Sequence, residues 1–179
     1  MKKILFLLLS CISILGCSDD ESPAITQPEA IEKASMSVKY NGEDLVFTDI
    51  SINPGGPDSP HALELISIIP YDDIYHTKYS LVMNFDRDET GGYTLYNMTL
   101  GVTERLGQNS FAMNGYYAYP TGEFATPNFT HSISTSIQNE KEHSITGTFN
   151  GTLLRGNDIP ESIQISDGKF SADFTAFIP

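Results

Sequence analysis

Residues 116–124 carry the side chains best suited to holding a ligand. They read Tyr-Tyr-Ala-Tyr-Pro-Thr-Gly-Glu-Phe, so aromatic rings stand beside a hydroxyl and a carboxylate, and an exposed ring flanked by polar groups can stack on a sugar. Alternate residues of a strand face opposite sides. We therefore predict that Tyr116 lies on the outer face, Phe124 lies in a loop, and these two residues bind a ligand. The alternative is that the rings are buried and only their hydroxyls reach the rim. The core face would hold the odd-numbered residues Phe111, Met113, Tyr117 and Tyr119.

The acidic loop at residues 86–92 has the residue types of a calcium ligand set. Its sequence, Asp-Arg-Asp-Glu-Thr-Gly-Gly, matches the first half of an EF-hand loop. An EF-hand is excluded, because Asn97 stands where that loop needs a bidentate Glu and the following residues alternate like a strand. A looser calcium site at Asp86 and Asp88 stays open, beside the alternative of a solvated hairpin turn.

Motifs of the common enzyme classes are absent from the sequence. It contains no GxSxG, HExxH, GxGxxG or P-loop pattern. We therefore expect no catalytic residues and no cofactor, in a protein that is not an enzyme. A hydrolase that uses two carboxylates remains an alternative, because β-sandwich enzymes often carry no readable local motif.

Period-two alternation of apolar residues begins near residue 36 and indicates the strands that must position these groups. Asn41-Gly42 is typical of a two-residue type I′ hairpin turn, which would pair Val38 with Leu45 and place both on one face.

Asp167-Gly168 suggests a second hairpin turn of this kind near the end of the chain. We predict a positive φ at Gly168, with Ile165 opposite Phe170 and both side chains in the core.

The remaining alternating segments predict an all-β fold. After a disordered tether, we expect an antiparallel β-sandwich or barrel of about 8–10 short strands. The segments lie at residues 63–69, 79–85, 93–102, 111–119, 129–137, 144–154, 162–166 and 169–177.

The charge balance bears on the class of partner. The chain has 179 residues, with 10 Lys and Arg against 23 Asp and Glu, and a formal net charge of -13. Nucleic-acid binding needs a basic surface to neutralise phosphates. A nucleic-acid partner is therefore excluded.

The N-terminus carries an export sequence. Two lysines precede an apolar run that ends near residue 15, which is shorter than the ~20 residues of a membrane-spanning helix. The tetrad Ile14-Leu15-Gly16-Cys17 resembles the lipobox of bacterial lipoproteins. The resemblance implies a signal peptide at residues 1–16, cleavage before Cys17, acylation of that residue, and a membrane partner reached through the lipid.

Two further segments resemble small, uncharacterised surface lipoproteins of Bacteroidota. Ser18, Asp19, Asp20 and Glu21 look like the acidic export signal that follows the lipidated Cys. Residues 144–153 and 165–170, with the letters SITGTFNGTL and ISDGKF, look like the pattern that closes such chains. The resemblance implies an outer-membrane, lipid-anchored protein facing the cell exterior. Its lipidated Cys, export signal and tether would occupy residues 17–35, and one β-domain would occupy residues 36–179.

These observations predict a surface-exposed outer-membrane lipoprotein whose β-domain binds an extracellular ligand. The ligand would be a glycan or a partner protein of an uptake assembly. The first alternative is an envelope module with a purely structural or interaction role, and the second is the carboxylate-based hydrolase.

Overall fold

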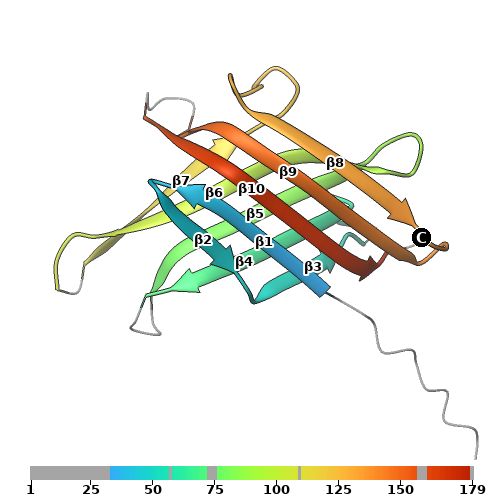
Figure 1. Ribbon diagram of the computed structural model, residues 1–179, viewed down its shortest axis with the longest axis horizontal. Coiled ribbons are helices and arrows are strands. Elements are labelled where there is room, and N and C mark those ends of the chain that lie inside the picture. The colour runs from blue at the N-terminus through green and yellow to red at the C-terminus, as the bar shows by residue number, and fades with distance from the viewer. Residues whose placement is uncertain (1–32, 57, 72–75, 109, 157–160, 178–179) are drawn as a thin grey trace, which may run out of the picture.

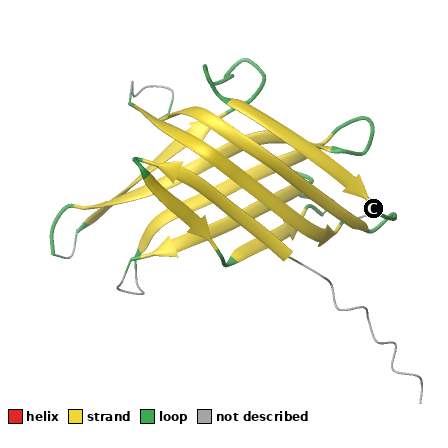
Figure 2. Ribbon diagram, in the orientation of Figure 1, coloured by secondary structure: helices red, strands yellow, loops and turns green. Residues whose placement is uncertain are grey.

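The computed structural model describes residues 33–56, 58–71, 76–108, 110–156 and 161–177. Within these residues every regular element is a β-strand, as the alternation predicts (Figure 2). The signal peptide, the lipidation site Cys17, the export signal from Ser18 to Glu21 and the tether as far as residue 32 lie outside the described residues, whereas the last three residues assigned to the tether, 33–35, belong to a strand.

In the described part of the chain, ten strands form one antiparallel sheet that curls until it is nearly closed into a barrel-like shape (Figure 1). Each strand pairs with its neighbour in sequence along most of the sheet, and β1 returns to pair with β10, so the sheet runs β2-β1-β10-β9-β7-β6-β5-β4-β3. The strands are β1 (Lys33–Tyr40), β2 (Glu43–Phe47), β3 (Ile50–Pro54), β4 (Leu63–Pro70), β5 (Thr77–Arg87), β6 (Tyr93–Arg105), β7 (Phe111–Ala118), β8 (Thr130–Ile137), β9 (Glu142–Leu154) and β10 (Ser162–Thr175).

Strands β7 and β8 follow one another along the same edge of β9. β8 pairs with residues 143–150 of β9, whereas β7 meets β9 farther along, where Tyr117 lies opposite Leu154. Both are antiparallel to β9, so the chain leaves β7, makes an excursion through residues 119–129, and re-enters as β8 in the same direction.

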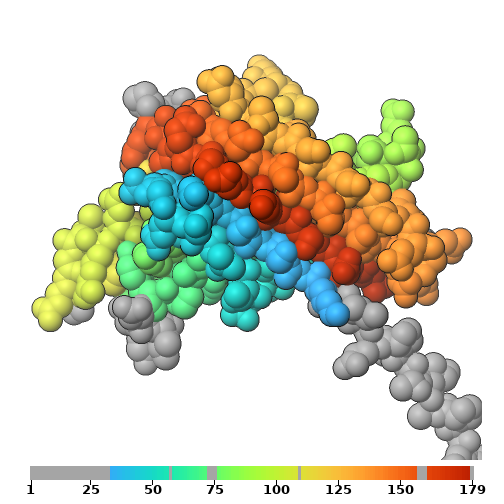
Figure 3. Space-filling model, viewed as in Figure 1, coloured from blue at the N-terminus to red at the C-terminus, as the bar shows by residue number. Residues whose placement is uncertain are grey.

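The interior of the curled sheet holds the core. Alternate residues of each strand point inward, which is why the sequence alternates with period two. The space-filling view shows the blue strands of the N-terminal part directly against the red β10 (Figure 3). The largest side chains less than 2% exposed are Phe47, Phe85, Phe149, Met36, Leu63, Leu65, Leu81, Met83, Met98, Leu100, Ile145 and Leu153.

The Asn41-Gly42 hairpin is confirmed. Asn41 and Gly42 have φ values of 51° and 81°, as a type I′ turn requires, and Val38 lies opposite Leu45. Because the turn and the alternation specify the same register, both side chains are buried in the core.

The predicted hairpin at Asp167-Gly168 is wrong. β10 runs through these residues as one strand, and the register shift between Ile165 and Gly168 marks a β-bulge. The left-handed residue is Asp167, with a φ of 53°. A Cβ built on Gly168 would lie 2.4 Å from two carbons of the Phe149 ring, so close packing, and not positive φ, explains this glycine.

Two element boundaries also differ from expectation. β3 was not predicted as a strand, and β1 begins at Lys33, slightly before the expected domain start at residue 36. Several strands are longer than the short strands expected, with 13 residues in β6 and β9 and 14 in β10.

Candidate functional site

The two faces of β7 are the reverse of those predicted. Tyr116 is only 3% exposed, whereas Tyr117 and Met113 are 38% and 62% exposed. Tyr116 lies opposite Leu100 of β6, and directly opposite residues of an antiparallel pair point to the same face. Because Leu100 is buried in the core, Tyr116 is buried as well. The expectation that Tyr116 is an exposed ligand-binding ring is therefore wrong.

Tyr116 belongs instead to a polar network that runs from the core to the surface at one end of the sheet. Its hydroxyl donates to Oε1 of Glu161 at 2.9 Å, and the Arg155 guanidinium donates to Glu161 and to the amide oxygen of Asn114. Burial, and then the hydrogen bond to Glu161, raise the pKa of Tyr116 to about 12. The hydrogen bond from Arg155, and then that from Tyr116, lower the pKa of Glu161. This network satisfies the buried polar groups of Asn114 and Tyr116 and ties β7 to Arg155, after β9, and to Glu161, before β10.

Phe124 lies in the loop after β7, as predicted, and is 62% exposed. It lines a small surface groove of about 160 Å³ with rings and short side chains around it. The groove is lined by Tyr117, Tyr119, Phe124, Thr126, Leu154 and Gly156. We call it the Phe124 groove.

The loop that carries Phe124 is held by its own hydrogen bonds. The backbone N–H of Thr126 donates to the carbonyl of Tyr119 at 2.8 Å, and the hydroxyl of Thr126 accepts from the N–H of Tyr119 at 3.0 Å. Gly122, with a φ of 91°, makes the turn that an L-residue would resist. Since Thr126 is itself buried, the loop presents Phe124 to solvent on a fixed backbone.

The residues that sequence analysis missed are therefore Tyr117, Tyr119 and Leu154. All three belong to the groove, yet Tyr117 and Tyr119 were assigned to the core. Asn114 is the residue of the sequence that could have indicated the correct faces of β7. It lies two residues before Tyr116 and so shares its face, and a polar amide there is compatible with a buried polar network, although it does not decide by itself which face is buried.

Asp86 and Asp88 use their carboxylates separately. Oδ1 of Asp86 lies 3.0 Å from Nδ1 of His61, while Oδ1 of Asp88 accepts from the N–H groups of Thr90 and Gly92 at 2.8 and 2.9 Å. These bonds, with the Thr90 hydroxyl bond first, lower the pKa of Asp88 and make the segment an ordinary hairpin turn. In the part of the chain that the structure describes, no three His, Cys, Asp or Glu side chains gather as a metal-ion ligand set.

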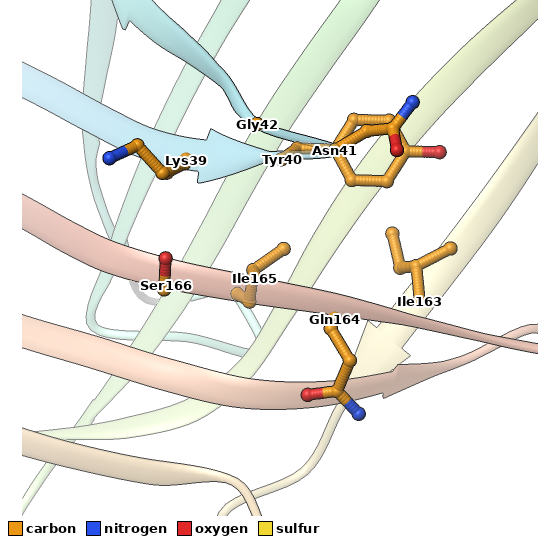
Figure 4. Close-up of a pocket in the computed structure, with 8 residues that line it drawn as sticks. All are labelled: Lys39, Tyr40, Asn41, Gly42, Ile163, Gln164, Ile165 and Ser166. Carbon is orange, nitrogen blue, oxygen red and sulfur yellow. The ribbon is translucent and has the colours of Figure 1, made fainter.

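A second hollow of about 570 Å³ opens where β1 and β10 separate beyond the bulge. Its one aromatic ring belongs to Tyr40. Ile163 and Ile165 point towards β1 and Gln164 points away from it (Figure 4). Its remaining lining is Lys39, Asn41, Gly42 and Ser166, a mostly polar and solvent-open set that presents a single ring. The Phe124 groove, with three rings, is the better candidate for binding.

The fold and the groove together define an all-β protein with a small aromatic groove on the outside of a curled sheet. No helix of the described residues is long and apolar enough to cross a membrane. No family model, no curated protein and no solved structure matches the chain.

Proposed function

We propose that this chain is a surface-exposed outer-membrane lipoprotein whose β-domain binds an extracellular ligand in the Phe124 groove. The observation that carries the proposal is the exposure of Phe124 on a loop fixed by Thr126. A glycan is the ligand class that this groove favours, and a partner protein of an uptake assembly is the other ligand class.

Phe124 is exposed on a fixed loop, where its ring is available to a ligand. Burying a ring of this size stabilises a protein by ~1.5–3 kcal/mol, and this loop forgoes that gain. A fixed loop also loses little conformational entropy when a ligand binds, which strengthens binding. The tyrosines of the groove have apolar rings and hydroxyl rims, and a sugar has an apolar face and hydroxyl edges in the same way.

The strand register supports a groove that is accessible from outside. The chain enters β1 at Lys33, which lies opposite Asp173 of β10, and Asp173 lies opposite Ser144 of β9. Leu154, which lines the groove, lies ten residues after Ser144 on β9. At a rise of ~3.3 Å for each strand residue, the two residues are ~30 Å apart. A lipid attached ahead of Lys33 would therefore join the domain at the end of the sheet farther from the groove, which leaves the groove accessible from outside.

The groove is tested with the full-length protein, extracted in mild detergent, on an array of neutral and acidic glycans. We expect binding that Phe124→Ala weakens. Met113→Ala is the matched control, because Met113 is also 62% exposed on the outer face of β7 but does not line the groove. Equal binding by the two variants would exclude the groove. A purely structural envelope module would bind no glycan and no partner, and a hydrolase would shorten the bound glycan.

The anchor is tested with Cys17→Ala. The motivation is the lipobox-like tetrad that ends at Cys17. We expect the variant to lose its acyl chains and to leave the salt-washed membrane fraction, where the wild type remains because two or more acyl chains give stable anchoring. A variant that stays with washed membranes would place the anchor elsewhere.

A further inference from the structure

Tyr96 is a second exposed ring beside the Phe124 groove. The register of β5 with β6 passes from Asn84 opposite Asn97 to Phe85 opposite Leu95, which leaves Tyr96 as the extra residue of a β-bulge. Neighbouring residues of a strand face opposite sides, so Tyr96 is 46% exposed on the outer face while Leu95 beside it is 3% exposed in the core.

His61 and Asp86 hold Tyr96 in this exposed position. The His61 ring packs against Tyr96 with centroids 4.7 Å apart and planes at 37°. Nδ1 of His61 lies 3.0 Å from Oδ1 of Asp86, and the His61 carbonyl accepts from the Ser59 hydroxyl at 2.8 Å. One side of the Tyr96 ring is therefore supported while much of the ring remains open to solvent. His61 and Asp86 act as positioning residues.

Tyr119 connects Tyr96 to the groove. Its ring centroid lies 6.3 Å from that of Tyr96, with the planes at 88°, and Tyr119 also lines the groove. The aromatic surface therefore continues from Phe124 across Tyr119 to Tyr96, over β7, β6 and the loop between β7 and β8. We call this surface the aromatic strip.

We propose that the ligand is a neutral oligosaccharide chain, with one sugar ring in the Phe124 groove and a later ring of the same chain on Tyr96. This inference rests on the proposed function and adds a second subsite to it. A groove of about 160 Å³ holds a single ring, whereas the strip continues beyond it. A protein partner would need a surface of ~800 Å² on each side, which favours a narrow chain over a protein.

The charges along the strip favour a neutral glycan over an acidic one. Glu123 is exposed next to Phe124 at one end, and the Asp86 side chain is 42% exposed beside His61 at the other. The whole chain carries a formal charge of -13. Within a Debye length of ~8 Å these carboxylates repel an anionic sugar, whereas they accept hydrogen bonds from the hydroxyls of a neutral one.

The test compares chain lengths by titration calorimetry of the full-length protein in mild detergent. The probes are cello-, malto-, xylo- and laminari-oligosaccharides of one to six sugars, with oligogalacturonides as the acidic series. We expect affinity for one neutral series to rise with length until both subsites are occupied. Tyr96→Ala should remove that rise, about three- to tenfold, and leave the affinity for the shortest binding sugar unchanged.

Two further variants separate the subsites. Phe124→Ala should weaken binding at every length, and Met113→Ala should weaken it at none. His61→Ala should lower affinity for the long chains but not for the short ones, since His61 acts through Tyr96.

Affinity that does not depend on length, or a Tyr96→Ala variant that behaves like Met113→Ala, would overturn the second subsite while a Phe124-dependent groove remained. Tighter binding of oligogalacturonides would overturn the neutral class. Failure of every sugar to bind, in these series and on the array, would overturn both the glycan groove and the strip.

Discussion

Replacing Gly168 by alanine is expected to destabilise the protein through a collision with Phe149. Gly168 lies in the bulge of β10 opposite Phe149 of β9, and it is Asp167 before it that has the positive φ. Alanine therefore fits the backbone of Gly168. A Cβ there would, however, lie 2.4 Å from two ring carbons and 2.6 Å from the carbonyl oxygen of Phe149.

The magnitude follows from the overlap. Carbon atoms in contact prefer ~3.5–4.0 Å, so the ring must move by roughly 1 Å. Phe149 is 1% exposed and has little room to move. Overpacking of this kind destabilises a core by ~1–3 kcal/mol. The lower entropy of an unfolded chain with alanine in place of glycine offsets ~0.4–1 kcal/mol of this. We expect a net loss of ~1–2 kcal/mol in the free energy of unfolding.

A double-mutant cycle measured by urea denaturation separates collision from backbone strain. Phe149→Leu removes the ring carbons that the new Cβ would meet, so Gly168→Ala should be less destabilising in that background by at least ~0.5 kcal/mol. Gly42→Ala is the matched control, because Gly42 has a φ of 81° and no neighbour within 4 Å of a built Cβ. Its penalty should be the same in both backgrounds. An equal penalty for Gly168→Ala in both backgrounds would refute the packing explanation.

Three further outcomes are expected. Phe170→Ala should lower the free energy of unfolding by ~3–5 kcal/mol in urea denaturation, because Phe170 is 3% exposed and its ring centroid lies 5.4 Å from that of Phe85; a loss below ~1 kcal/mol would contradict this packing. The folded protein raises the pKa of Tyr116 from its ordinary value of 10.0 to about 12. As the pH rises from ~10 through 12, the unfolded chain therefore loses the Tyr116 hydroxyl proton before the folded chain does, and the free energy of unfolding should fall. Tyr116→Phe should flatten this alkaline loss in urea titrations, and an unchanged slope would count against it. Replacing Asp19, Asp20 and Glu21 by alanine should preserve lipidation but reduce the amount of this protein that an external protease removes from intact cells. Equal removal of the variant and the wild type would mean that the segment is a plain linker.

The two dipeptides that resemble hairpin turns show how far local sequence determines the fold. At Asn41-Gly42 the alternation on both sides agrees with a two-residue turn, and the hairpin forms. At Asp167-Gly168 the left-handed preference of Asp is real, since Asp167 has a φ of 53°. The pairing of β10 with β1 on one side and β9 on the other keeps the strand continuous, so the same local preference produces a bulge. The all-β class was predictable from alternation, but this choice depended on neighbours distant in sequence.

The candidate site was predictable in location but not in orientation. The aromatic content of residues 111–119 identifies a strand with rings on both faces, and either face satisfies the alternation. Pairing with β6 decides between them, because Leu100 opposite Tyr116 must face the core. The Tyr116 hydroxyl also donates a hydrogen bond to Glu161, a partner that sequence alone does not place beside it. A one-residue error of phase exchanges every inward and outward side chain of a strand.

The groove itself follows from the way β7 and β8 share one edge of β9. Because both strands run in the same direction along that edge, no tight hairpin can join them, and the chain must leave the sheet and return. The interior beneath is filled by side chains such as Leu100 and Leu153, both 0% exposed, so the excursion cannot turn inward. The connection between β7 and β8 lies on the outer surface instead. Two hydrogen bonds between Thr126 and Tyr119 hold its two ends together and leave Phe124 exposed beside the outer face of β7. The groove is thus a consequence of topology. The residues that form it can be read in the sequence, whereas the strand arrangement that brings them together depends on long-range pairing.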